Sequence, residues 1–172
     1  MGQRMYTIRR AFLIPFTLVV FLLFFLLLIS MFFRGTLAEA IFLAVIFLIS
    51  FLIFLEAKSR MVNVGDQGIR LKKFMRIKEV SWEDISYVGT LTIRSKVYLL
   101  LTTVKGFLIL SNAYEEFPGL VRDIVQHVSA ERVEQEVRAQ MERPVTNWGN
   151  VIAAWIATAV IAGIISVKLI PF

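Results

Sequence analysis

The sequence predicts an α+β membrane protein, with a transmembrane helical hairpin, a small antiparallel β domain and a third transmembrane helix in that order. Hydrophobic residues make up 58% of the 172 residues, above the roughly 45–50% of a soluble globular domain. Long uncharged segments near both ends are typical of membrane spans. The segment between them alternates apolar and polar residues and carries turn signals. A chain of this length accommodates one small soluble domain beside such spans.

Two long apolar segments predict a helical hairpin in residues 1–58. Residues 11–33 contain no charged residue, which is enough at about 1.5 Å per residue to cross a hydrocarbon core of about 30 Å. Residues 37–55 are apolar except for Glu39. Because only residues 34–36 join the two segments, we expect an antiparallel hairpin.

Glu39 leaves two interpretations open. An acidic residue inside a membrane helix is by default a functional candidate, which makes Glu39 a candidate for a proton or ion pathway in a transporter. The alternative is structural. Glu39 falls in the first turn of its helix, where a carboxylate reaches interfacial water and favours the positive end of the helix dipole.

The third predicted span, residues 148–170, differs from the first two in composition. Its uncharged part is rich in Ala, Gly and Ser rather than Phe and Leu. Small residues recur at intervals of four, which allows helices to approach closely. We expect packing on the protein's own hairpin or, alternatively, on a helix of another protein. The small residues concerned are Gly149, Ala153, Ala157, Ala159 and Gly163.

The positions of the basic residues indicate the membrane topology. Residues 56–147 contain fourteen Lys and Arg against twelve Asp and Glu, which accounts for about +2 of the total +6. The excess lies at the membrane flanks, with three Arg before the first span and only Arg34 in the hairpin turn. By the positive-inside rule, we expect the N-terminus and the β domain on the cytoplasmic side of the membrane and the C-terminus outside. A nucleic-acid partner would require a basic face across the folded domain, and none is predicted.

Residues 60–129 have the alternation of an antiparallel β domain that ends in a helix. We expect strands at 61–65, 69–74, 77–81, 85–93, 96–103 and 106–111, separated by turn chemistry. The nearly continuous apolar runs within the last two strands suggest that both of their faces are covered. Pro118 is well placed to start an amphipathic helix that reaches Val128.

Five basic residues cluster within nine positions of the first predicted hairpin, before any acidic residue. They form either a solvated strand face or a contact with anionic lipid headgroups or a partner, with each cation near a membrane surface contributing about 1 kcal/mol. These residues are Arg70, Lys72, Lys73, Arg76 and Lys78.

The sequence contains no recognisable catalytic or cofactor site. It has no Cys, and its single histidine, His127, has no second His or Cys with which to share a metal. We interpret Ser81 and Asp84 as a capping box rather than as part of a catalytic pair. No glycine loop for phosphate is present. We therefore predict that the protein is not an enzyme and has no metal or cofactor. The sequence identifies no small-molecule substrate.

Several of these segments together resemble the bacterial pleckstrin-homology (PH-like) domain family. They are the turn Asp66-Gln-Gly-Ile69, the run Val80-Ser-Trp-Glu-Asp-Ile85, the strand Gly106-Phe-Leu-Ile-Leu110 and the helix that starts at Pro118. The resemblance implies a partly open β-barrel capped by a helix, often found beside two-helix membrane hairpins. Together with the predicted spans, it implies a multi-pass protein of a bacterial inner membrane. It also implies a binding platform for lipids, proteins or peptides rather than a catalyst.

We predict a linker helix over residues 130–146. Its narrow apolar stripe consists of Val133, Val137 and Met141. The helix is either solvated or docks a partner. The whole chain then predicts a non-catalytic accessory or assembly subunit of a membrane protein complex. Its expected partners are membrane lipids and another membrane protein subunit or a second copy. An anionic-lipid sensor and the transporter component using Glu39 are the alternatives.

Overall fold

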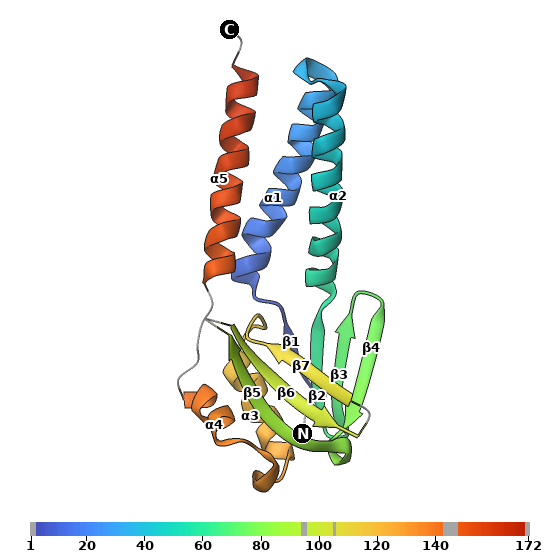
Figure 1. Cartoon of the computed structure of the whole chain (residues 1–172), viewed down its shortest axis with the longest axis vertical. Coiled ribbons are helices and arrows are strands. Elements are labelled where there is room, and N and C mark those ends of the chain that lie inside the picture. Colours follow the sequence, from blue (N-terminus) through green and yellow to red (C-terminus); the bar gives the residue numbers. More distant parts are fainter. Residues whose placement is uncertain (1–2, 94–95, 105, 143–147, 171–172) are drawn as a thin grey trace. The chain divides into compact units, whose positions relative to one another are not determined.

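The structure is a computed structural model that describes residues 3–93, 96–104, 106–142 and 148–170. It confirms an α+β protein with antiparallel strands and three long apolar helices. The strands form two sheets (Figure 1). The chain divides into two compact units. The β unit consists of Met1–Arg9 and Ser59–Asn147, and the helical unit consists of Arg10–Lys58 and Trp148–Phe172.

The first sheet of the β unit has the strand order β1-β2-β3-β4, all antiparallel. β2 (Met61–Gly65), β3 (Gly68–Lys73) and β4 (Arg76–Ser81) match the expected strands. Their alternate side chains point inward because successive residues of a strand face opposite sides. Gly68 fits the turn between β2 and β3, since its φ is +156° and a Cβ there would lie 2.1 Å from the Val80 carbonyl oxygen. The buried members are Val62, Val64, Ile69, Leu71 and Val80.

Strand β1 (Arg4–Thr7), which precedes the first long helix and pairs with β2, is not among the predicted strands. Residues 1–10 were predicted only as a basic flank of the first span. In the structure Tyr6 and the following Ile8 are buried at 6% and 5% exposure, so this segment is part of the β unit's core. Its partner strand lies more than fifty residues away, and four residues are too short for periodicity to identify.

The second sheet contains β5 (Ile85–Ile93), β6 (Lys96–Thr103) and β7 (Gly106–Ser111) in that order. Among the described residues, the seven strands form two sheets rather than one closed barrel. Hydrogen bonding between strands stops at a 3₁₀ turn, Trp82–Asp84. The free edge of β5 is instead occupied by Glu134, whose backbone N–H donates to the Val88 carbonyl at 2.9 Å.

The expected capping box at this turn is wrong. Ser81 makes no side-chain capping hydrogen bond. The turn ends after three residues at Asp84, so it is too short to present the unpaired N–H groups that a capping box satisfies. Trp82 anchors the turn instead, because its indole Nε1–H donates to the Gly65 carbonyl at 2.9 Å.

Two helices complete the β unit. α3 (Phe117–His127) follows the predicted position closely and buries Leu120, Val121 and Ile124 completely. α4 (Gln135–Glu142) falls in the segment predicted as a linker, yet Val137 just inside it is fully buried. The β unit therefore extends beyond residues 60–129 in both directions, to β1 and to α4.

The helical unit consists of α1 (Arg10–Ile29), α2 (Leu37–Ser59) and α5 (Gly149–Leu169). A π-helical turn, Ser30–Arg34, prolongs α1. The apolar stretches are 24, 23 and 21 residues long, or about 31 to 36 Å at 1.5 Å per residue. All three are long and apolar enough to cross a membrane.

The hairpin turn requires a glycine at position 35. A Cβ on Gly35 would lie 2.1 Å from the backbone oxygen of Ser30. Only a residue without a side chain permits this close approach. The short connection that the sequence predicts between the first two spans therefore rests on this glycine.

Packing inside the helical unit is uneven. α1 contacts α5 along much of its length and buries six residues, whereas α2 buries only Leu43. The three helices meet at one cluster that contains Leu26, Leu43 and Ile165. Away from the hairpin turn, α1 and α2 diverge (Figure 1).

Candidate functional site

The outer side of the second sheet is an exposed apolar surface, which we call the apolar sheet face. The register places its side chains in adjacent pairs: Leu91 lies opposite Tyr98, and Leu100 opposite Ile109. Five of its residues are 43–61% exposed, and Tyr98 and Leu100 are half-buried. The face consists of Tyr87, Leu91, Ile93, Tyr98, Leu100, Phe107 and Ile109.

The apolar runs of β6 and β7 were expected to be covered on both sides. Their inward residues, Leu99, Leu101, Leu108 and Leu110, are fully or almost fully buried. Their outward residues meet no comparable cover from the part of the chain that the structure describes. In that outward register Lys96 is the only charged residue among the described strand positions. Contiguous exposed apolar surfaces are typical of interaction sites, so this face is a candidate site.

Gly89 interrupts the apolar sheet face at the edge of β5. A Cβ there would lie 2.8 Å from the Glu134 carboxylate, which accepts the Thr90 backbone N–H at 2.9 Å. The glycine thus lets the carboxylate close the strand edge. Because this edge is capped, the face of the sheet, rather than that edge, is the surface open to a partner.

The five basic residues predicted as a cluster lie in the β3–β4 hairpin but do not share one face. Arg70 forms a 2.7 Å ion pair with Glu79 in the opposite strand, with both side chains exposed. Such a pair contributes little to stability but partly neutralises Arg70. The ammonium of Lys78 donates to the Phe107 carbonyl at 2.6 Å. These two cations are therefore already engaged within the β unit.

The other three basic residues lie around the hairpin turn together with exposed apolar side chains. Lys73 and Arg76 face each other across the turn, and Lys72 is opposite Ile77. Phe74 is 46% exposed and Met75 is 87% exposed. We call residues 72–76 the basic tip. It combines cations with apolar groups, as a contact with an anionic membrane surface requires.

A buried carboxylate that sequence reasoning did not single out joins β1 to α3. Asp123 is only 6% exposed, and it accepts hydrogen bonds from the Tyr6 hydroxyl at 2.6 Å and the Arg4 guanidinium at 3.0 Å. Burial, together with the hydrogen bond to Asp123, raises the pKa of Tyr6 to about 12. Hydrogen bonding to Tyr6 and the charge of Asp123 raise the pKa of Arg4.

A small polar cavity of about 180 Å³ adjoins this carboxylate and is partly lined by Arg4, Asp66 and His127. The His127 ring stacks on Trp82 with centroids 4.5 Å apart, and its Nδ1 lies 2.8 Å from the Asp123 carbonyl oxygen. His127 is half-buried, and its stacking on Trp82 links α3 to the Trp82 turn. No group of three His, Cys, Asp or Glu capable of holding a metal occurs among the described residues.

Glu39 forms an ion pair with Lys168 in the helical unit. Glu39 lies in the first turn of α2, where its backbone N–H donates to the Thr36 hydroxyl at 3.2 Å, and Lys168 lies in the last turn of α5. Each charge is therefore at the helix end whose dipole it favours. The pair supports the structural interpretation of Glu39 and gives Lys168 a role that the sequence did not reveal.

α5 contacts the protein's own α1, but largely without the small residues predicted for close packing. Its buried residues are Val151, Ala154 and Ile165, and the Thr158 hydroxyl donates to the Pro15 carbonyl at 3.3 Å. A Cβ on Gly163 would meet no atom within 4 Å. Gly149, Ala153, Ala159 and Gly163 are exposed and Ala157 is half-buried.

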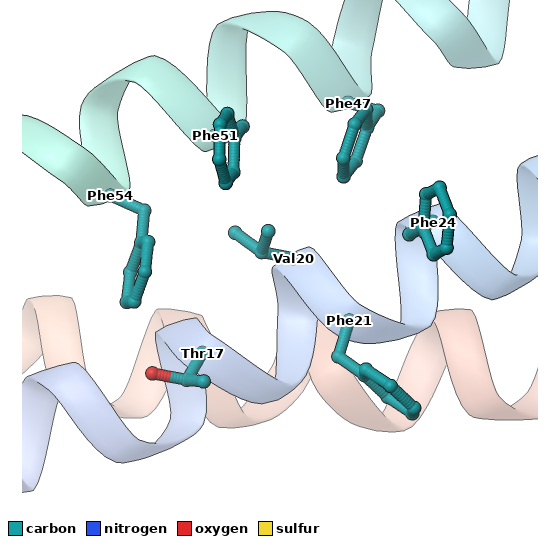
Figure 2. Close-up of a pocket in the computed structure, with 7 residues that line it drawn as sticks. All are labelled: Thr17, Val20, Phe21, Phe24, Phe47, Phe51 and Phe54. Atoms are coloured by element: carbon teal, nitrogen blue, oxygen red, sulfur yellow. The ribbon is translucent and has the colours of Figure 1, made fainter.

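A groove of about 340 Å³ lies between α1 and α2 (Figure 2). Figure 2 shows Phe47 and Phe51 directed from α2 toward α1, and Val20 directed toward Phe51. The Thr17 hydroxyl donates to the Leu13 carbonyl at 2.7 Å, so the one polar side chain of the lining is already engaged. The lining residues are Thr17, Val20, Phe21, Phe24, Phe47, Phe51 and Phe54.

The features that sequence reasoning missed depend on contacts between distant segments. Tyr6 and Asp123 are separated by more than a hundred residues, and so are Glu39 and Lys168. A local signal existed for each: Tyr6 and Ile8 alternate, Asp123 falls among the apolar residues of α3, and Lys168 is the single charge in its span. None of these signals identifies its partner.

Comparisons with protein-family models, with curated proteins and with solved structures found no match to this chain.

Proposed function

We propose that this protein is a non-catalytic membrane-anchored binding module, an accessory subunit whose apolar sheet face docks a protein partner. The exposed apolar sheet face carries this proposal. Soluble surfaces rarely expose contiguous apolar patches of this kind unless they bind something. Aromatic residues such as Tyr87, Tyr98 and Phe107 are also the types enriched at the centres of protein interfaces.

The proposal includes a PH-like β unit. The observed arrangement of two antiparallel sheets with α3 packed into their core is compatible with the partly open barrel and capping helix that the resemblance implies. A PH-like unit would act as a binding platform for a protein, a peptide or a lipid.

We further propose that α1, α2 and α5 span a bacterial inner membrane and that the β unit faces the cytoplasm. The pairing of β1 with β2 supports the first part of this topology. These strands flank the hairpin of α1 and α2 in sequence, so two spans must return the chain to the side from which it started. The basic flanking residues favour the cytoplasmic side.

The partner proposal is tested by replacing Ile109 with Lys in the full chain and purifying the protein in mild detergent. Ile109 is 54% exposed on the apolar sheet face, so the substitution should leave folding intact while releasing the partner. Ile77→Lys is the matched control, because Ile77 is 57% exposed on the first sheet. A complex that survives Ile109→Lys and Ile77→Lys equally would contradict the proposal.

A second candidate function is the recognition of anionic lipid by the basic tip. Lys72, Lys73 and Arg76 flank the exposed Phe74 and Met75, which suits electrostatic attraction combined with shallow apolar insertion. A fluorophore at Met75 in nanodiscs would then shift toward apolar emission with anionic but not zwitterionic lipid, and less so at high salt. Replacing the three cations with Ala should abolish the shift. Arg70→Ala should not, because Arg70 is paired with Glu79.

A further inference from the structure

The groove between α1 and α2 is flanked toward each end by an aromatic pair that bridges the two helices. The ring centroids of Phe24 and Phe47 are 5.4 Å apart at one end, and those of Phe16 and Phe54 are 6.4 Å apart at the other. The space between them, about 340 Å³, is at the low end of the range for ligand pockets. The groove is therefore a slot that is framed by rings toward both ends and open along its outer side.

The two aromatic pairs oppose the entry of a third helix between α1 and α2. A helix with its side chains is about 10–12 Å across, and it would have to separate both aromatic pairs. Close packing of membrane helices also relies on small residues at the contact, whereas five Phe rings line the groove. A flexible hydrocarbon chain can lie against these rings without displacing them.

Basic residues at one end of the groove indicate that the hydrocarbon chain belongs to a lipid with an anionic headgroup. The ammonium of Lys58, one turn beyond Phe54 in α2, lies 5.9 Å from the centre of the Phe54 ring. Arg10 opens α1 at the same end of the hairpin. The Thr17 hydroxyl is engaged by Leu13, so the groove interior offers apolar contact and its end offers positive charge.

We propose that the groove between α1 and α2 binds one acyl chain of an anionic phospholipid whose phosphate contacts Lys58. The proposal requires these helices to span a bilayer, but it is independent of the protein partner at the apolar sheet face. It assigns to the phenylalanine-rich hairpin a specific lipid site rather than a purely anchoring role.

The test uses the full chain in nanodiscs with phosphatidylglycerol that carries a diazirine on one acyl chain, and crosslinked peptides are located by mass spectrometry. Labelling should concentrate on the groove residues of α1 and α2. Thr17→Phe fills the slot and should lower this labelling several-fold. Leu18→Phe adds the same ring at the neighbouring position outside the lining and should leave it unchanged.

The headgroup contact is tested by Lys58→Gln, which should lower labelling by phosphatidylglycerol but not by a phosphatidylcholine analogue, and Lys58→Arg should retain it. Because Lys58 is exposed, Lys58→Gln still tests the proposal if Thr17→Phe impairs folding. Equal labelling at the groove and at the exposed Phe42, unaffected by any substitution, would show bulk lipid contact only and overturn the proposal. A chain that never enters nanodiscs would overturn the membrane assignment as well.

Discussion

Asp123 connects the N-terminus of the chain to the rest of the β unit. Its carboxylate is almost fully buried, yet it is satisfied by Tyr6 and by Arg4 from β1. A buried charge is tolerable only when it is paired and hydrogen-bonded in this way. The three residues thus explain why a four-residue edge strand stays attached.

Tyr6→Phe is expected to destabilise the β unit at neutral pH. The substitution removes one hydrogen bond to a buried carboxylate while keeping the ring, which should cost about 1.5–3 kcal/mol. The measurement is guanidinium unfolding of the full chain in detergent, with Trp148 and Trp155 replaced by Phe so that Trp82 alone reports. An unchanged midpoint would mean that the Tyr6–Asp123 contact contributes nothing to stability.

The same hydroxyl predicts a difference in alkaline stability. An unfolded tyrosine ionises near pH 10, whereas the folded chain raises the pKa of Tyr6 to about 12. Ionisation therefore favours the unfolded state, and the contribution of Tyr6 is complete below pH 10 and lost as the pH rises through about 12. The stability gap between the wild type and Tyr6→Phe should narrow by roughly 2 kcal/mol over that interval. A gap independent of pH would contradict the assignment.

Lys168 and Glu39 make a testable pair within the helical unit. Both side chains are partly buried, at 23% and 34% exposure, so either Glu39→Gln or Lys168→Gln should lower Tm by about 2–4 °C, equivalent to about 1 kcal/mol. The charge-swapped double variant, Glu39→Lys with Lys168→Glu, should recover part of this loss. Additive losses in the double variant would show that the two residues do not interact.

At the scale of elements, the largest difference between the predicted and the observed fold is strand β1. Pairing between β1 and β2 predicts that Met5→Cys and Asn63→Cys form a disulfide, because directly opposed antiparallel residues lie within the required Cα separation. The chain has no native Cys to interfere. Crosslinking would be read as a mobility shift after mild oxidation.

Met5→Cys with Arg70→Cys is the matched control for this disulfide. Arg70 lies opposite Asn63 on the next strand, which places it about two strand spacings, or roughly 9.6 Å, from Met5. That distance exceeds what a disulfide spans. Equal crosslinking of both pairs would show that β1 is not held in this register.

The elements with strong periodicity were predictable and those defined by distant partners were not. β2 through β7, α3 and the three long helices fall within a few residues of their predicted positions, because alternation, turn residues and long uncharged segments are local properties. β1 and the docking of α4 through Val137 depend on surfaces created by the rest of the fold. The sequence predicted that the β3–β4 hairpin is basic. It did not predict the ion pair between Arg70 and Glu79 or the hydrogen bond from Lys78 to the Phe107 carbonyl.

At the scale of the whole molecule, the proposed module has distinct surfaces for distinct contacts. The helical unit presents a phenylalanine-lined groove with cations at one end, and the β unit presents an apolar sheet face and a basic tip. These surfaces consist of different residues, so each proposal fails or succeeds separately. The docking of a protein partner on the apolar sheet face is the central claim.

Site-specific photocrosslinking in intact membranes tests that claim most directly. A photoreactive phenylalanine analogue placed at Leu91 or Ile109 should yield one discrete protein adduct, and the same analogue at Ile77 should not. Adding Phe107→Lys to the Ile109 variant should abolish the adduct. Adducts of equal yield from Ile77, or an apolar sheet face that crosslinks only to lipid, would contradict a protein partner at this surface.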